Sequence, residues 1–174
     1  MPKDGGIGAS SKRREDVRFL TGNGNYTDDI NRRGQAHVFF LRSDVAHGVL
    51  KSVDTSAASG MDGVVQIFTG ADFEAVGGMP CGWQVTDKHG EAMQEPKHPV
   101  LAHGKVRHVG EPIAAVVAET LAQARDAAEA IVVEIDELPA VVNMKDAVKD
   151  GAPKVHDDLT SNLCYDWGFV EENK

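Results

Sequence analysis

The sequence is poor in cysteine and in aromatic residues, and it has no long apolar run. Its 174 residues include two cysteines, Cys81 and Cys164, outside any CxxC motif, and aromatic residues make up 6%. This usage argues against a disulfide framework and against a zinc module. No run approaches the ~18 apolar residues that indicate a membrane span, and residues 1–6 do not resemble a signal peptide. We therefore expect a cytoplasmic protein without a membrane span.

Basic residues are also scarce relative to acidic ones. The chain has 18 Lys and Arg against 27 Asp and Glu, which gives a net charge of −9. Ten acids and four bases fall in residues 134–174, whereas residues 1–18 hold five bases and three acids. Proteins that bind nucleic acid normally present a basic surface. The sequence therefore predicts no nucleic-acid partner, and residues 12–14 are interpreted as a solvated arm or a subunit contact.

The common reactive motifs are missing. The glycine clusters at residues 5–8 and 22–24 neither follow a strand nor begin a helix, as a dinucleotide fingerprint requires, and there is no P-loop, G-x-S-x-G or H-E-x-x-H motif. His98, His103 and His108 stand five positions apart, a spacing that suits neither one helix face nor one strand face. We interpret the histidines as surface or loop residues. We predict no catalytic residue, no metal ligand and no cofactor-binding residue in this chain.

What the sequence does contain is an alternation of strands and short helices. Residues 18–20 are expected to form a short apolar anchor after the arm, and the pattern is broken between residues 77 and 99. Strands are expected at residues 36–43, 48–53, 64–68, 112–118 and 131–135, with short helices at 56–61 and 144–148. This order gives two strand–helix–strand units, at residues 49–68 and 113–135. The predicted class is α+β with a mixed sheet. The predicted domain spans residues 20–150, between an N-terminal arm at 1–19 and an acidic tail at 151–174.

The clearest helix signal follows the strand at residues 112–118. Thr120 and Gln123 form a capping-box pattern, in which the threonine hydroxyl accepts a hydrogen bond from the third helical N–H. Apolar residues recur behind them at helical spacing, namely Leu121, Ala124, Ala127, Ala128 and Ile131. Because most of this face is alanine, the helix is expected to lie close against a sheet.

Several segments resemble carbon monoxide dehydrogenase large chains, in the order in which that family has them. They lie at residues 6–22, 25–30, 42–47, 67–72, 99–102, 105–112, 114–119, 137–142 and 162–167. The chain thus resembles the molybdenum hydroxylases, the family of aldehyde oxidase, xanthine dehydrogenase and carbon monoxide dehydrogenase, and is nearest to the last. The resemblance implies the α/β hammerhead domain with which large subunits of this family begin.

The same resemblance implies that the chemistry lies elsewhere. The molybdopterin cytosine dinucleotide of the family is bound by later domains of the large subunit, and iron–sulfur and FAD groups are carried by partner subunits. Neither Cys81 nor Cys164 fits the copper-binding loop of carbon monoxide dehydrogenases. We carry over no catalytic residue. Gly110, Glu111 and Pro112 are the candidates for contact with the absent domains, and a purely structural turn is the simpler interpretation of this segment.

Three interpretations stay open at this point. The chain is either a front piece of a larger oxidoreductase, without activity by itself, or a stand-alone small binding or assembly module. A third reading, a nucleotide-dependent enzyme using the loop at Gly22, is weaker. Near the end, aromatic residues alternate with other residues as on one face of a strand, namely Tyr165, Trp167 and Phe169. Such a strand would pack either on a following domain or on the domain to which it belongs.

Overall fold

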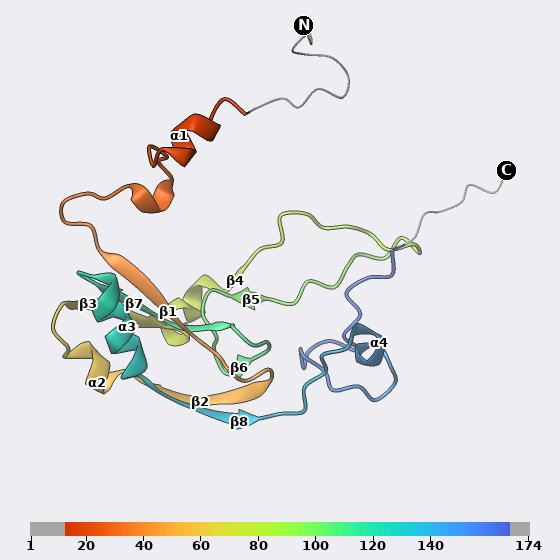
Figure 1. Cartoon of the computed structure of the whole chain (residues 1–174). Coiled ribbons are helices and arrows are strands. Elements are labelled where there is room, and N and C mark those ends of the chain that lie inside the picture. The colour runs from red at the N-terminus through yellow and green to blue at the C-terminus, as the bar shows by residue number, and fades with distance from the viewer. Residues whose placement is uncertain (1–12, 168–174) are drawn as a thin grey trace, which may run out of the picture. The chain divides into compact units, whose positions relative to one another are not determined.

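The computed structural model (Figure 1) describes residues 13–167. These residues fall into two units, 13–35 and 36–167. In the first unit, α1 (Asp16–Leu20) is followed by the 3-10 helix η1 (Thr27–Asp29). The ring of Phe19 stacks on that of Tyr26 at a centroid distance of 5.4 Å, but Leu20 is 86% exposed. The expectation of an apolar anchor at residues 18–20 is therefore wrong for Leu20. The glycine cluster at 5–8, Lys12 and Phe169 lie outside the described residues.

The second unit is built on two three-stranded sheets (Figure 1). In one sheet, β7 (Pro112–Ala118) lies between β1 (His37–Arg42) and β3 (Val64–Thr69). In the other, β2 (Gly48–Asp54) lies between β6 (Lys105–Val106) and β8 (Val132–Glu137). The predicted strands are thus present, and β6 adds a short one that sequence patterning did not separate from the loop around it.

The α+β class is confirmed, but the strand directions differ from the expected mixed sheet. Every ladder described in residues 13–167 is antiparallel. The two predicted strand–helix–strand units exist along the chain, yet each joins strands of different sheets: β2 to β3 through α2 (Ser56–Ser59), and β7 to β8 through α3 (Leu121–Glu129). Because each helix carries the chain between sheets, neither unit forms the parallel pair that a crossover within one sheet would give.

The core lies where α3 packs on the sheet of β1 and β7. Ala124, Ala127 and Ala128 are buried against Ala114 and Val116 of β7, which confirms the predicted alanine face. Thr120 Oγ1 accepts a hydrogen bond from the Gln123 N–H at 3.2 Å, as the capping pattern predicted. Leu121 is 40% exposed and does not belong to that face. A second apolar cluster, Ala102, Val106 and Ile113, packs against residues of the other sheet, including Leu50 and Ile135.

The segment where the sequence pattern broke forms a long loop closed by a two-stranded ribbon. The 3-10 helix η2 (Gly70–Val76) leads into β4 (Gly78–Met79), which pairs with β5 (His98–Pro99). The tip of the loop meets residues 163–167, since the Lys88 N–H donates to the Asp166 carbonyl at 3.0 Å and the Gln94 N–H to the Cys164 carbonyl at 2.9 Å. The predicted strand at residues 165–169 is wrong over its described part, which has no strand.

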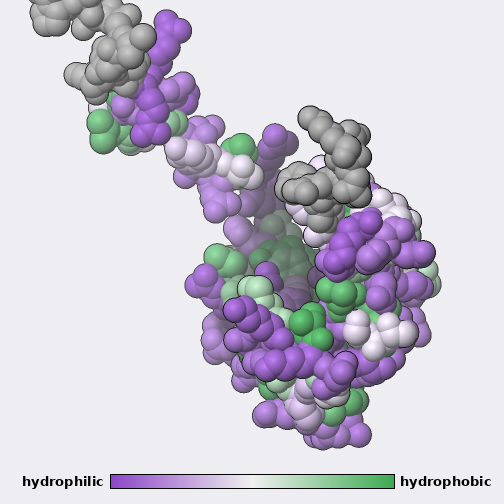
Figure 2. Space-filling view, turned by 90° about the vertical axis from the view of Figure 1, so that its right-hand side faces the viewer, coloured by the Kyte–Doolittle hydropathy of each residue, from purple (hydrophilic) through white to green (hydrophobic). Residues whose placement is uncertain are grey.

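After β8 the chain forms α4 (Met144–Ala147), whose N-cap residue Asn143 accepts a hydrogen bond from the Lys145 N–H at 2.8 Å. Figure 2 shows one face of the molecule as mainly hydrophilic, with separate hydrophobic groups between the polar ones. None of the helices in residues 13–167 has the length and hydrophobicity needed to cross a bilayer.

Candidate functional site

The candidate segment Gly110–Pro112 forms the turn that leads from β6 into β7. Gly110 has a φ of +87°, a conformation that favours glycine. Its N–H donates to the Ser43 carbonyl at 2.7 Å, and the Ser43 N–H donates to the Glu111 carbonyl at 2.9 Å. The Arg42 guanidinium donates to the Gly110 carbonyl at 2.8 Å. The turn is therefore fixed to the end of β1.

Glu111 is a buried acidic residue, with 3% of its surface exposed. Its carboxylate accepts a hydrogen bond from the Arg107 N–H and lies 3.8 Å from Nδ1 of His108. Its own N–H donates to the His108 carbonyl at 3.2 Å. Buried carboxylates persist in proteins when such partners replace the lost water. Glu111 thus stabilises the 107–111 turn through contacts inside the turn.

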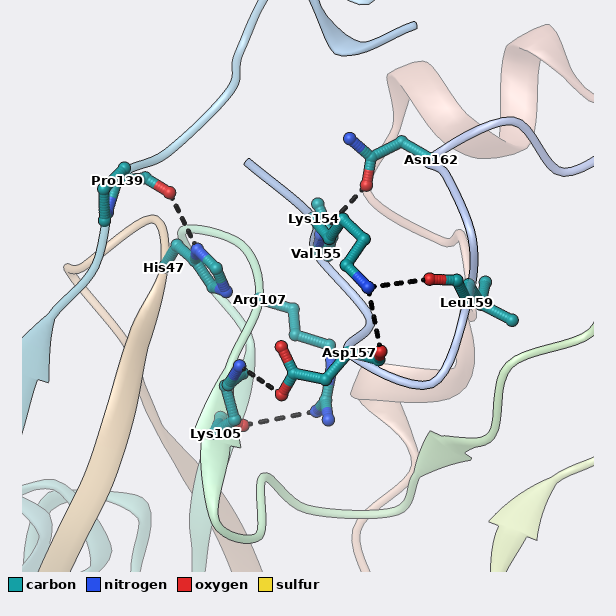
Figure 3. Close-up of polar contacts among 9 residues, drawn as sticks. All are labelled: His47, Lys105, Arg107, Pro139, Lys154, Val155, Asp157, Leu159 and Asn162. Carbon is teal, nitrogen blue, oxygen red and sulfur yellow. Dashed lines mark hydrogen bonds and ion pairs between the residues drawn. The ribbon is translucent and has the colours of Figure 1, made fainter. Parts of the chain in front are cut away.

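A polar cluster beside this turn joins the second sheet to residues 153–162 (Figure 3). Lys105 Nζ contacts the Asp157 carboxylate at 2.6 Å, and this ammonium group holds the pKa of Asp157 below its usual value. Lys154 Nζ donates to the Asp157 and Leu159 carbonyls at 3.1 and 3.0 Å. These contacts place part of the acidic tail directly against β6.

Asn162 fixes the same segment by its side-chain amide. Its Oδ1 accepts a hydrogen bond from the Val155 N–H at 2.9 Å, and its Nδ2 donates to the Ala147 and Pro153 carbonyls at 3.0 and 2.9 Å. One amide therefore ties α4 to the chain that follows it, so residues 153–162 have a defined path despite their lack of helix or strand.

The histidines were expected on the surface or in loops, and His47 lies in the loop before β2 but not on the surface. His47 is only 6% exposed, and its Nδ1 lies 2.9 Å from the Pro139 carbonyl. His156 is partly buried, and this burial, with the positive charge of Arg107, lowers its pKa. The rings of His98 and His108 lie 6.4 Å apart, which their sequence spacing did not indicate. Within residues 13–167, no three His, Cys, Asp or Glu side chains are grouped so that they could hold a metal ion.

The remaining candidates of the sequence are scattered. The glycine cluster at 22–24 follows α1 rather than a strand, so it lacks the setting of a nucleotide-binding loop. Cys81 and Cys164 are both exposed and free. Cys164 Sγ donates to the Gln94 carbonyl at 2.9 Å, whereas Cys81 Sγ contacts the Trp83 carbonyl at 3.1 Å.

The turn at Gly110–Pro112 does not fit a pyrophosphate group. Loops that bind pyrophosphate present free backbone N–H groups. Here the Gly110 and Glu111 N–H groups are used within the chain, and Pro112 has none. The Glu111 carboxylate would in addition repel a phosphate. We therefore assign no dinucleotide contact to this turn, and its contact with a further domain stays a prediction.

His47 and Arg107 are the functional candidates that sequence reasoning missed. Each carries a buried side-chain nitrogen, His47 Nε2 and Arg107 Nε, without a hydrogen-bond partner among residues 13–167. Both residues line one cavity. Both residues lie in segments that carry the family resemblance, 42–47 and 105–112, but neither segment indicates that these side chains are buried. Residues from separate parts of the chain meet at one cavity only after folding.

Comparison with known proteins places this architecture in a family. Residues 21–139 match the family model described as "Aldehyde oxidase and xanthine dehydrogenase, a/b hammerhead domain". The chain belongs to this family. The recognition of a molybdenum hydroxylase hammerhead domain from the sequence motifs is thereby confirmed.

Two curated relatives show how much of a large subunit this hammerhead chain represents. It is 40% identical to the nicotine 6-hydroxylase large subunit of Paenarthrobacter nicotinovorans, over 83% of this chain and 17% of the relative. It is 38% identical to the carbon monoxide dehydrogenase large chain of Hydrogenophaga pseudoflava, over 84% of this chain and 17% of the relative. The hammerhead chain therefore spans about 17% of the length of these relatives.

Solved structures agree. The crystal structure of quinoline 2-oxidoreductase from Pseudomonas putida 86 superposes with a TM-score of 0.76 at 40% identity, covering 89% of this chain and 19% of that one. The Cu,Mo-CO dehydrogenase in its carbon monoxide reduced state gives a TM-score of 0.70 at 33% identity, over 93% of this chain and 19% of that one. The hammerhead chain thus has the fold of one part of these larger chains.

Proposed function

We propose that this chain is a structural domain of a molybdenum-dependent oxidoreductase and performs no chemistry by itself. The observation that carries the proposal is coverage: a hammerhead match over residues 21–139, in relatives of which the chain spans about 17%. The remaining domains of the large subunit would bind the molybdopterin cytosine dinucleotide. Partner subunits would carry the iron–sulfur and FAD groups. In this proposal residues 1–19 are an arm, 20–150 the hammerhead domain, and 151–174 lead toward the following domain.

The geometry of the candidate site supports a structural role. Glu111, the buried carboxylate of the candidate turn, is held by contacts with Arg107 and His108 within the chain. An apolar cavity of about 400 Å³ is lined by Trp83, Val85, Met93, Tyr165 and Trp167. Trp83 is 80% exposed there. Exposed aromatic groups of this kind are typical of surfaces that contact another domain.

The test is elemental analysis with an activity assay. The purified 174-residue chain, expressed in a host that makes the cofactor, is compared with a large subunit in which further domains follow. We expect stoichiometric molybdenum only in the longer protein, and no oxidation of carbon monoxide, aldehyde or purine by the 174-residue chain. Stoichiometric molybdenum in the short chain would overturn the proposal.

A second candidate concerns the substrate of the parent enzyme. Two of the similar proteins, nicotine 6-hydroxylase and quinoline 2-oxidoreductase, are named for nitrogen-containing aromatic substrates, and each is 40% identical to this chain. This similarity makes hydroxylation of a nitrogen heterocycle an alternative to carbon monoxide oxidation as the reaction of the parent enzyme. Assays of the complete enzyme with quinoline and with carbon monoxide, using one artificial electron acceptor, separate the two substrates.

A further inference from the structure

A cavity of about 270 Å³ opens beside the polar cluster, between the turn before β2 and the chain that follows β8. His47 and Arg107 lie on its lining, together with Val109, Val142, Pro153 and Val155. A single bound water needs far less space than this. The cavity therefore has room for a small organic group.

The polar end of the cavity is defined by the ring of His47. A backbone carbonyl only accepts hydrogen bonds, so the contact between Nδ1 and the Pro139 carbonyl at 2.9 Å places a proton on Nδ1. Nε2 is then a lone-pair acceptor in the neutral ring or an N–H donor in the charged one. Nε2 is buried and has no hydrogen-bond partner among residues 13–167, and His47 as a whole is only 6% exposed. Such a group costs free energy unless a ligand pairs with it.

Arg107 adds a permanent positive charge to the same lining. Its Nη1 donates to the Lys105 carbonyl at 3.3 Å, but its Nε–H is buried and finds no acceptor in the described chain. Two carboxylates close to this segment already have partners. Glu111 accepts a hydrogen bond from the backbone N–H of Arg107. Asp157 contacts Lys105 (Figure 3). Both residues thus line the cavity, and each has one buried side-chain nitrogen, His47 Nε2 and Arg107 Nε, without a partner in residues 13–167.

The other wall of the cavity is apolar. Val109 and Val142 are 63% and 91% exposed, which is unusual for valine, and Pro153 and Val155 continue this wall. An occupant with a hydrocarbon body would cover these side chains, while its polar end met His47 and Arg107.

We propose that this cavity binds a carboxyl group carried on a small apolar body. One carboxyl oxygen accepts from Arg107, and the other shares one proton with His47 Nε2, either as a neutral acid on a neutral ring or as a carboxylate on an imidazolium. An alcohol or an amide would leave the positive charge of Arg107 without an anion. The group comes either from a free organic acid or from an Asp or Glu side chain of a longer polypeptide.

The first test is calorimetric titration of the 174-residue chain with benzoate, with benzyl alcohol as the matched ligand without a carboxylate. We expect saturable binding of benzoate alone. The variant His47→Asn keeps an amide donor for the Pro139 carbonyl but lacks Nε2, and should weaken benzoate at least about tenfold, the effect of losing one charge-assisted hydrogen bond. Arg107→Lys should weaken it as well.

His89→Asn, at an exposed histidine of the long loop, is the control and should leave the benzoate affinity unchanged. The melting temperature of each variant shows whether it is folded. Absence of benzoate binding to the wild-type chain, or binding that His47→Asn leaves intact, would overturn the proposal. A structure with only water on Nε2 at saturating benzoate would do so too.

The second test separates the two sources of the carboxyl group and, unlike the first, depends on the proposed function. The titration is repeated on a large subunit that contains the following domains. Retained binding identifies a free acid as the occupant. Lost binding, with an Asp or Glu side chain seated on His47 in the structure, identifies a carboxyl group of the protein itself. An apolar side chain in that place would contradict the proposal.

Discussion

Ile113 in β7 and Glu111 just before that strand show two ways in which this fold is stabilised. Ile113 is 2% exposed and packs in an apolar cluster with Ala102 and Val106. Glu111, two positions earlier, is equally buried at 3%, but it is held by hydrogen bonds within the 107–111 turn. Apolar packing is non-directional, so many sequences achieve it, whereas a buried charge needs partners at defined positions. The comparison thus separates a core that patterning can specify from a polar turn that depends on exact placement.

The largest effect is expected on the apolar side. Ile113→Ala should lower the free energy of unfolding by about 2–5 kcal/mol, because it leaves a cavity between the two sheets. Val65 of β3 is 60% exposed, so Val65→Ala is the matched control. It should change the free energy of unfolding by no more than about 0.5 kcal/mol. Urea unfolding followed by circular dichroism measures both. Equal losses would mean that burial in the Ile113 cluster adds no stability beyond that of an exposed apolar side chain.

A smaller loss is expected on the polar side. Glu111→Ala should cost about 1–3 kcal/mol, since it leaves the Arg107 N–H buried without an acceptor. Glu111→Gln keeps an oxygen that can accept this hydrogen bond and should cost less. The same urea experiment ranks the two variants. If Gln and Ala were equally destabilising, the charge of Glu111 rather than its acceptor oxygen would stabilise the turn.

The N-cap of α3 is a local hydrogen bond that supports the helix packed on the apolar core. Thr120→Ala removes the hydroxyl that accepts from the Gln123 N–H and should cost about 1 kcal/mol. Thr120→Ser retains a hydroxyl and should recover most of this loss. Thermal unfolding of the three proteins checks the order wild type, Ser, Ala, and a stable Ala variant would show that core packing alone sets the start of α3.

The smallest effect concerns pH. Burial and the charge of Arg107 lower the pKa of His156 in the folded chain, so just below the ordinary pKa of 6.5 the unfolded chain binds more protons. The His156 contribution to stability is therefore lost as the pH falls through about 6.5. The urea midpoint of wild type, minus that of His156→Gln, should decrease from pH 7.5 to pH 5.5. An increase would contradict the stated direction of the pKa shift.

How far the sequence predicts the fold is clear from particular elements. Strands β1, β2, β3, β7 and β8 and helix α3 were predicted because each carries a local signal: β-branched runs, or alanines at helical spacing behind a cap. The antiparallel pairing was missed, because strand direction depends on which sheet receives each strand. The supposed strand at residues 165–169 failed over its described part, where residues 163–167 instead pair with the loop near Lys88 and Gln94.

The candidate site was less predictable than the fold. Gly110, Glu111 and Pro112 were singled out through a family resemblance, and the structure adds that their hydrogen bonds are used within the chain. His47 and Arg107 were not singled out, because a buried nitrogen without a partner has no sequence signature. Their shared cavity is lined by residues that lie far apart along the chain.

The sequence by itself indicated the family, through the resemblance of its motifs, and it indicated the α+β class and the alanine face of α3 through hydrophobic periodicity. Only the tertiary structure decided that each strand–helix–strand unit links two antiparallel sheets, and that the acidic segment at 153–162 lies against β6. The physical reason is that hydrophobic periodicity is a property of residues close together in the sequence. Strand pairing, ion pairs and the lining of a cavity depend on residues that only folding brings together.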